Sequence, residues 1–396
     1  MAPLINVKLS LANIRTTKSV SETGFVFTVK TDNAGTSNDD QFTLPLISSF
    51  NGITAKVDWG DGNSDTITAY NQPEVTHTYA SSGTYTIKIT EAFRALRFDN
   101  GGDKLKILNI SNWGIFEFTN DEAFFGCANI TQTATDSPTV SATDMHSTFA
   151  NCSVFDGYID DWDVSNVQDF RFFLSSALVF NQPLNSWDVS SGNRFVQSFR
   201  FARRFNQPLN NWDVSSVYDM NQMFYAATDF NQSIDAWDVS NVNNTNQMFR
   251  FASSFNQPLN NWDVSAVTSM YGMFRDTVAF NQPLSNWDVG NVTTMGSMFR
   301  KNDAFDQDIS SWNIVKVSNA TDFMENCDGF STANYDALLI GWEATLQSAH
   351  SGGSGYTLTP SWHFGNSQYT AGGSAAAARA SLISNFNWGI TDGGTA

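Results

Sequence analysis

The sequence predicts an α+β protein in which an N-terminal β-sandwich is followed by a stack of about nine 25-residue coils and a C-terminal cap. Three observations predict this fold. Tryptophans recur every 25 residues from Trp162 to Trp312, and phenylalanines keep the same step from Phe155 to Phe330. Alternating polar and apolar residues with glycine turns fill residues 24–92, and two segments with helical spacing follow the last repeat. A period of 20–29 residues is typical of a solenoid, in which each coil is one supersecondary unit.

The N-terminal part divides into a leading segment and a β domain. Residues 1–23 are a candidate docking arm if the protein is part of a particle, and a plain leader to the β domain if it is an adhesin. Their start, MAPLINVKLS, has neither the basic nor the apolar region of an ordinary secretion signal. Within 24–92, VDWGDGNSDTI and VTHTYASSGTYTIKI each place two alternating runs around a glycine turn. The pattern W-G-D-G, H-x-Y and G-x-Y-x-I resembles a PKD-type immunoglobulin-like sandwich. The resemblance implies that Asp61, Gly62, His77 and Tyr79 form its framework.

The repeats occupy residues 124–330, and 93–123 are predicted to be degenerate first coils. Within one repeat, Leu209-x-x-Trp212-x-Val214 has the form of a leucine-rich-repeat strand with tryptophan in the middle apolar position. Apolar residues from Val217 to Ala227 follow at helical spacing, and a capping box at residues 216–219 precedes them. Each coil is therefore predicted to be a short strand and a short helix, stacked in parallel on the next coil.

Residues 331–396 are predicted to be the cap of the last coil. NYDALLIGWEATL (334–346) has the pattern of an amphipathic helix, and SAAAARASLISNF (374–386) is a second helix with Ser374 as its N-cap. The final WGITDGG is expected to form a last strand. Caps of this kind cover the open edge that a repeat stack would otherwise expose.

The repeats and the C-terminal segment, residues 93–396, resemble the BspA-like leucine-rich-repeat surface proteins. The resemblance rests on FNQPLNNWDVSSV (205–217), the x-Met-Phe that follows it, and YDALLIGW…YTAGGSAAAARASLI…GITDGG. Members are mostly bacterial surface proteins, and some occur in eukaryotic parasites and in viruses. The resemblance implies a non-enzymatic adhesin or recognition protein that binds a protein or glycan on a cell surface. The alternative is a structural virion component, such as a phage decoration, fibre or appendage protein that contacts neighbouring subunits of a particle.

Composition and motifs exclude several other classes. The 39 acidic and 21 basic residues give a net charge of −18, which argues against nucleic-acid binding. The sequence has no run of 18 apolar residues, so we expect no insertion into a membrane. The sequence contains no His-Glu-x-x-His, Cys-x-x-Cys, Gly-x-Ser-x-Gly or phosphate loop, so we expect neither an enzyme nor a cofactor. The expected location is extracellular or on a particle surface, reached by virion assembly or by a non-Sec export route.

One column of aspartates is the first candidate site. Strand alternation would point these residues outward between a buried tryptophan and a buried valine. Carboxylates stacked ~4.8 Å apart repel by roughly 3 kcal/mol per pair at an effective dielectric of ~20. We expect backbone N–H groups of the following turn to offset this repulsion, with a calcium ladder or a direct ligand-binding stripe as alternatives. The column consists of Asp163, Asp188, Asp213, Asp238, Asp263 and Asp288, closed by Asn313.

A second column contains Arg200, Tyr225, Arg250, Arg275 and Arg300. We expect solvated side chains on an exposed helix face, with a partner-contacting basic stripe as the alternative.

Two further columns have structural interpretations. The Asn-Gln pairs at 181/182, 206/207, 231/232, 256/257 and 281/282 are expected to form side-chain ladders between turns, with sugar binding as the alternative. Cys127, Cys152 and Cys327 share one column and are expected to be small buried fillers. Cys127 and Cys152 lie on adjacent coils, where a disulfide is sterically conceivable but not required.

Overall fold

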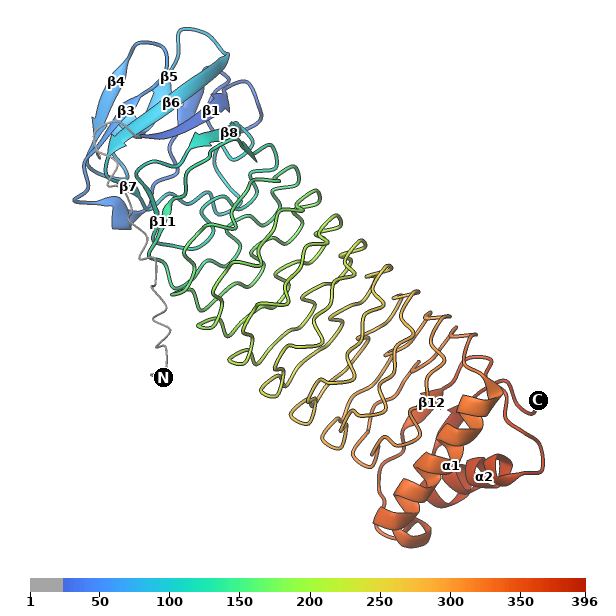
Figure 1. Ribbon diagram of the computed structural model, residues 1–396. Coiled ribbons are helices and arrows are strands. Elements are labelled where there is room, and N and C mark those ends of the chain that lie inside the picture. Colours follow the sequence, from blue (N-terminus) through green and yellow to red (C-terminus); the bar gives the residue numbers. More distant parts are fainter. Residues whose placement is uncertain (1–23) are drawn as a thin grey trace, which may run out of the picture.

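The computed structural model describes residues 24–396, so the candidate docking arm, residues 1–23, lies outside the described residues. Figure 1 shows strands at one end of the molecule, a long stack of coils in the middle, and two helices at the other end. The described chain has thirteen strands and two α-helices, which agrees with the α+β class. No described helix has the length and hydrophobicity needed to cross a bilayer.

The N-terminal end is built on a six-stranded sheet in the order β10-β8-β1-β6-β3-β4. Alternate residues of β1 are buried, as the sequence pattern predicts, and β1 runs antiparallel to both β6 and β8. The sheet continues past residue 92, because β8 and β10 belong to it. Its strands are β1 (Phe25–Lys30), β3 (Ala55–Asp58), β4 (Ser64–Ile67), β6 (Thr84–Glu91), β8 (Ile107–Asn112) and β10 (Thr131–Gln132).

Two smaller sheets and two short 3₁₀-helices accompany this sheet. The first small sheet pairs β2 (Gln41–Thr43) with β5 (Thr76–Thr78), and the second has the order β11-β9-β7. The members of the second are β7 (Phe93–Arg94), β9 (Phe116–Phe118) and β11 (Thr139–Val140), and its pairs are parallel. The 3₁₀-helices are η1 (Ser48–Phe50) and η2 (Pro73–Val75).

A fully buried ion pair joins the loop after β1 to the segment before β8. The Lys106 ammonium donates to the carbonyl oxygens of Ser37, Asn38 and Gln41 at 2.8–3.1 Å, and it lies 3.9 Å from Asp103. Asp103 in turn accepts from the backbone N–H groups of residues 36, 37 and 43. Both side chains have no exposed surface, so each polar group is matched inside the protein.

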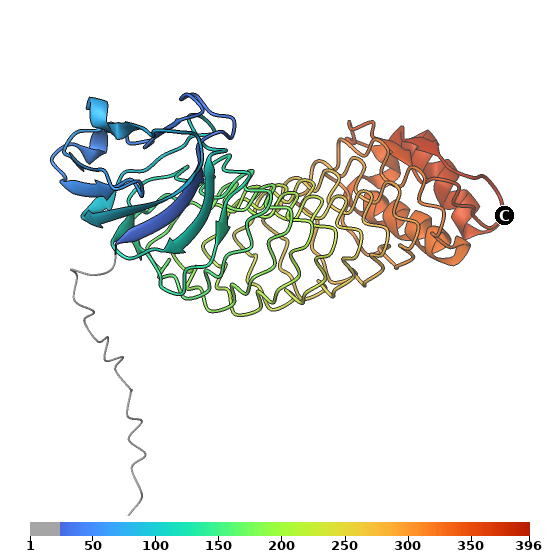
Figure 2. The same ribbon diagram turned by 90° about the horizontal axis from the view of Figure 1, so that it is seen from above.

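The coils stack with an unbroken 25-residue step (Figure 2). Parallel bridges join equivalent residues from Asp144 to Asn319, one per pair of neighbouring coils. Phenylalanine rings stack between coils, as in Phe205 on Phe230, where the ring centroids are 6.0 Å apart. From Trp187 onward, the tryptophan indoles of the column also donate to a carbonyl of the preceding coil: Trp187 to Ile159, Trp212 to Leu184, Trp237 to Leu209, Trp262 to Ile234, Trp287 to Leu259 and Trp312 to Leu284.

The prediction of a strand and a helix in each coil is wrong. Between Val140 and Thr332, a range described in full, the backbone forms turns and single bridges. Amides alternate between partners: Met223 N–H donates to Met220 of its own coil, whereas Phe224 N–H donates to Met248 of the next. Gln222 and Ala226 both have φ of 55°, which ends any helix. Apolar steps of three residues fit these turns as well as they fit a helix.

The C-terminal cap contains both predicted helices, α1 (Thr332–Ala349) and α2 (Ser374–Phe386). The residue before α2 is Gly373, so Ser374 is its first helical residue and the predicted N-cap is wrong by one position. The strands β12 (Ser361–His363) and β13 (Gly389–Thr391) pair in parallel, and η3 (Ser351–Gly353) follows α1. Trp342 on α1 donates its indole N–H to Ile309 at 3.0 Å, so the cap repeats the bond that joins the coils.

Candidate functional site

The aspartate column lies exposed along one face of the stack, although no strand underlies it. Each carboxylate accepts a hydrogen bond from the backbone N–H two residues later, as in Ser190 N–H to Asp188 at 3.1 Å. The Ser190 hydroxyl donates to the same carboxylate at 2.6 Å. The geometry matches the expected hydrogen bonds to the turn. The backbone bonds run from Ser165 to Asp163, Ser190 to Asp188, Ser215 to Asp213, Ser240 to Asp238, Ser265 to Asp263 and Gly290 to Asp288.

These hydrogen bonds lower the pKa of three aspartates of the column, Asp188, Asp238 and Asp263. Donation from Ser190 lowers the pKa of Asp188 below its usual value, and donation from Ser240 does the same for Asp238. The pKa of Asp263 is also lowered, by Ser265, although the neighbouring Asp238 acts in the opposite direction. At Asp263, stabilisation of the charged form by the turn therefore outweighs the like-charge repulsion from Asp238.

The column also borders a shallow depression of about 560 Å³ near Asp235, Asp238 and Asp263. Asp235 already accepts from the side-chain amide of Asn261. A potential metal-binding group needs at least three ligand atoms within 4.8 Å of one another. Among the described residues, no carboxylate of the column belongs to such a group. The calcium ladder stays an untested alternative.

The arginine column has a different environment from the expected one. Its side chains are half-buried between turns and do not lie on a helix. The Arg200 guanidinium lies 4.3 Å from the ring centroid of Phe201 and 5.2 Å from that of Tyr225. Arg250 lies 5.5 Å from Tyr225 and 4.7 Å from Phe251. The structure thus brings two predicted arginines and Tyr225 together with two phenylalanines that the sequence interpretation missed.

The last two arginines of the column bond to acidic side chains. Arg275 lies 3.3 Å from Asp276, and Arg300 pairs with Glu325. A sequence signal for the missed phenylalanines does exist, because the tetrapeptide FRFA occurs at 199–202 and again at 249–252.

The Asn-Gln pairs form a hydrogen-bonded ladder. Asn181 Oδ1 accepts from Asn206 N–H at 3.0 Å and from Gln207 Nε2 at 3.1 Å. The same pair of bonds recurs at each later coil, up to Asn281, which accepts from residues 306 and 307. These amide oxygens are therefore already used between coils, as the ladder interpretation predicts.

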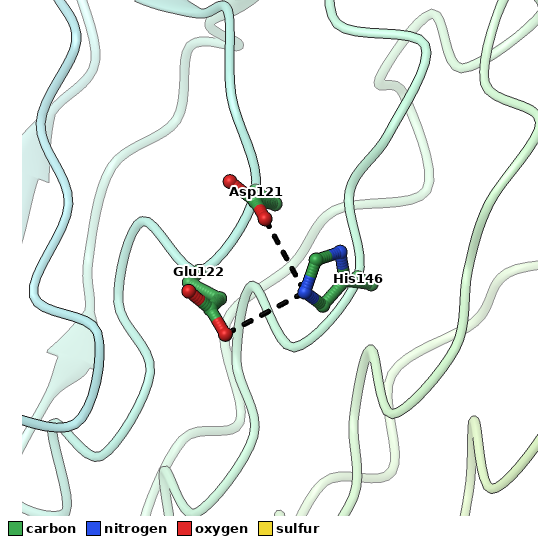
Figure 3. Close-up of side chains that lie close together, drawn as sticks. All are labelled: Asp121, Glu122 and His146. Carbon is green, nitrogen blue, oxygen red and sulfur yellow. Dashed lines mark ion pairs between the residues drawn. The ribbon is translucent and has the colours of Figure 1, made fainter.

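The first coils contain a cluster that sequence reasoning missed (Figure 3). His146 Nε2 lies 3.2 Å from Asp121 Oδ2 and 3.5 Å from Glu122 Oε1. Its Nδ1 lies 2.9 Å from Asp144, and the Arg97 guanidinium contacts both Asp121 and Glu122. The signal in the sequence is the 25-residue step from Asp121 to His146, which places them on adjacent coils.

The three ligand atoms of this cluster lie within 4.8 Å of one another and could hold a metal ion. Ligands ~2.0–2.1 Å from a tetrahedral zinc lie about 3.3 Å apart, close to the two histidine distances. Arg97, however, already bonds to the carboxylates. In the next coil Arg171 bonds to Asp169 through its backbone N–H and Nε, as His146 bonds to Asp144. The cluster therefore continues a row of charged side chains between coils, and a metal ion would have to displace Arg97.

The three cysteines are buried, and none of them forms a disulfide. Cys152 donates to the carbonyl of Phe124, and Cys327 donates to that of Asn302. Burial raises the pKa of Cys127 and Cys152 well above the usual thiol value and raises that of Cys327 to about 12. These are the properties of buried fillers, which hold little reactive thiolate at neutral pH.

The residues of the predicted β-domain framework also lie together. His77 Nε2 lies 2.9 Å from Asp61, and its ring stacks on Trp59 with centroids 4.8 Å apart. The Tyr79 hydroxyl donates to the carbonyl of Trp59 at 3.1 Å, and Gly62 has φ of 91°, a conformation that favours glycine. These contacts hold the turn between β3 and β4 against β5.

Comparison with known proteins places the repeats in a family. The model of the family described as "Mycoplasma protein of unknown function, DUF285" matches residues 118–237 and 219–337, together more than half of the chain. No curated protein and no solved structure matches the chain. The match fits the expected BspA-like repeat protein. The chain therefore belongs to the DUF285 family.

Proposed function

We propose that this protein is a non-enzymatic recognition protein displayed on an outer surface, where the outer faces of its coils bind a protein or glycan. On this proposal the stack of coils is a solenoid of the leucine-rich-repeat kind, and the N-terminal sheets form a PKD-type immunoglobulin-like sandwich. Solenoids create extended surfaces on which binding residues can be presented.

The observation that carries the proposal is the contrast between the buried columns and the column of Phe201. The buried Trp and Phe columns keep one residue type along the stack, with Trp at residues 162, 187, 212, 237, 262, 287 and 312. The column of Phe201 instead changes in each coil: Ser176, Phe201, Ala226, Phe251, Asp276 and Lys301. The interior is thus one repeated scaffold, and the exposed aspartate column is uniform as well, whereas the column of Phe201 differs from coil to coil, as a surface adapted to a partner would.

An adhesion assay tests this function. Beads coated with the full chain should adhere to a susceptible cell monolayer, and beads coated with the chemically unfolded chain should not. Pretreatment of the cells with trypsin or with glycosidases separates a protein from a glycan receptor. Adhesion no greater than that of albumin-coated beads on every surface tested would contradict the proposal.

A further inference from the structure

A row of alternating arginine and aromatic side chains stands out on the outer face of the coils. It consists of Phe201, Arg200, Tyr225, Arg250 and Phe251, and we call it the Arg-aromatic stripe. The centroid of Tyr225 lies 5.4 Å from that of Phe201 and 5.5 Å from that of Phe251. Each guanidinium lies over two of the rings, at 4.3–5.5 Å from their centroids. These are distances at which cation–π attraction operates, so the arginines are held in place.

The arginines of the stripe have unmet bonding capacity. Within the part of the chain that the structure describes, Arg200 and Arg250 form no ion pair, whereas Arg275 and Arg300 in the same column do. The Nε–H groups of Arg200 and Arg250 are buried and have no acceptor among the described residues. In a chain with 39 acidic residues, two neighbouring arginines without a carboxylate are a local excess of positive charge.

The two phenylalanines occupy a costly backbone conformation. Phe201 has φ of 58° and Phe251 has φ of 63°, in the left-handed region that bulky side chains rarely adopt. The equivalent position holds Ala226 in the intervening coil, so the fold does not require an aromatic residue there. The same left-handed conformation recurs at this position in neighbouring coils, with φ of 62° at Ser176, 55° at Ala226 and 58° at Asp276, so the repeat turn imposes the backbone and only the side chains distinguish the stripe.

We propose that the Arg-aromatic stripe binds an acidic polypeptide segment of a partner protein, a step that rests on the recognition function proposed above. A guanidinium fixed over aromatic rings keeps the N–H groups at its edge for a carboxylate, which it binds through two parallel hydrogen bonds. Arginine and tyrosine also dominate the energetics of protein interfaces.

A peptide fits this surface better than a sugar. Each ring of the stripe has a face covered by a guanidinium, which leaves less ring surface for a sugar to stack on. A groove of about 380 Å³ continues from Phe201 across the preceding coils, lined by Leu178, Arg203 and small residues. Arg203 adds a further exposed positive charge beside the stripe. The groove therefore gives an extended chain room to continue past the two fixed arginines.

The test is the affinity of the full chain for a fluorescein-labelled glutamate-rich peptide, measured by fluorescence anisotropy at low ionic strength and again at ~0.15 M salt. The double variant R200Q/R250Q should bind at least about 30-fold more weakly, the loss typical of interface hot spots. R275Q is the matched control, because Arg275 lies in the same column but is paired with Asp276. It should bind within about 3-fold of the wild-type chain.

The variant R200K/R250K separates geometry from charge. It keeps both positive charges but loses the planar fork, so we expect roughly a 10-fold loss of affinity. Thermal unfolding of each variant checks that the coils still fold. Equal losses of affinity in R275Q and R200Q/R250Q, or no peptide binding at all, would overturn the proposal. It would also be overturned if the chain bound hyaluronate more tightly than the peptide and R200Q/R250Q abolished that binding. Adhesion of coated beads without peptide binding would refute only the stripe, whereas peptide binding without adhesion would refute only the proposed function.

Discussion

Replacing Lys106 with methionine tests whether the buried ion pair holds the loop after β1 against the segment before β8. Methionine has nearly the length of lysine and fills much of the same space, but it cannot donate hydrogen bonds. The change removes donation to three carbonyls and to the Ser37 hydroxyl, all within 3.1 Å of the ammonium. It also leaves the buried carboxylate of Asp103 without its neighbouring positive charge.

Breaking a buried ion pair by removing one partner costs about 3–5 kcal/mol. If the segment opens locally, a loss of about 3 kcal/mol makes hydrogen exchange roughly 100-fold faster, because 1.36 kcal/mol is a factor of ten. The amides to follow are those of Thr36, Ser37 and Thr43, which donate to Asp103. Exchange measured by mass spectrometry should accelerate in peptides that contain these amides, while peptides from the later coils stay protected.

The matched control is Lys104→Met, two residues away. Among residues 24–396, the Lys104 ammonium bonds only to Asn100 at the surface, so its removal should change exchange by less than about 3-fold. Unchanged protection of residues 36–43 in Lys106→Met would refute the reasoning, because it would mean that the ammonium does not hold this loop.

Four further outcomes are expected. Asn231→Ala should lower the free energy of unfolding by about 1–3 kcal/mol in urea titrations, because two donors of the next coil lose their acceptor, and exposed Ser233→Ala should not. Calcium and EDTA should leave the Tm unchanged, since the aspartate column is already bonded to its turns; a rise in Tm with calcium would favour the cation ladder. By NMR, the pKa of Asp188 should lie below its usual range and should return toward that range in Ser190→Ala. Because the pKa of Asp188 is lower in the folded than in the unfolded chain, its contribution to stability is present above the unfolded pKa and is lost as the pH falls through the folded pKa. Iodoacetamide at mildly alkaline pH should not modify buried Cys152 until the chain unfolds, and rapid labelling of the native protein would contradict its burial.

The sequence alone predicted the features that a strict repeat encodes. The Trp and Phe columns and the Asn-Gln ladder follow from the 25-residue step, because equivalent residues of neighbouring coils must meet. The two cap helices are long enough for their pattern to be read locally. The backbone of the coils was not readable in this way. Whether the N–H of Phe224 donates to its own coil or to Met248 depends on packing between coils, and neither Gln222 nor Ala226 signals a left-handed turn as glycine would.

The candidate sites likewise contain features that the repeat predicts and contacts that only the folded structure shows. The columns of Asp188 and Arg200 could be listed from the repeat alone. The contacts of Arg200 with Phe201 and Tyr225 could not, because they depend on the direction of side chains in a turn that was predicted to be a helix. The cluster around His146 similarly needs Arg97 and Asp144, which lie outside its column and meet it only in the folded chain.

Display on an outer surface is the claim on which the proposed function depends most. Immunogold electron microscopy of the intact producing culture, with antibody against residues 124–330, measures it directly. Gold on the cell envelope of unpermeabilised cells is the result we predict. Gold on virus-like particles would instead identify a structural component of a virion. Label confined to the interior of permeabilised cells would contradict a protein that recognises partners outside.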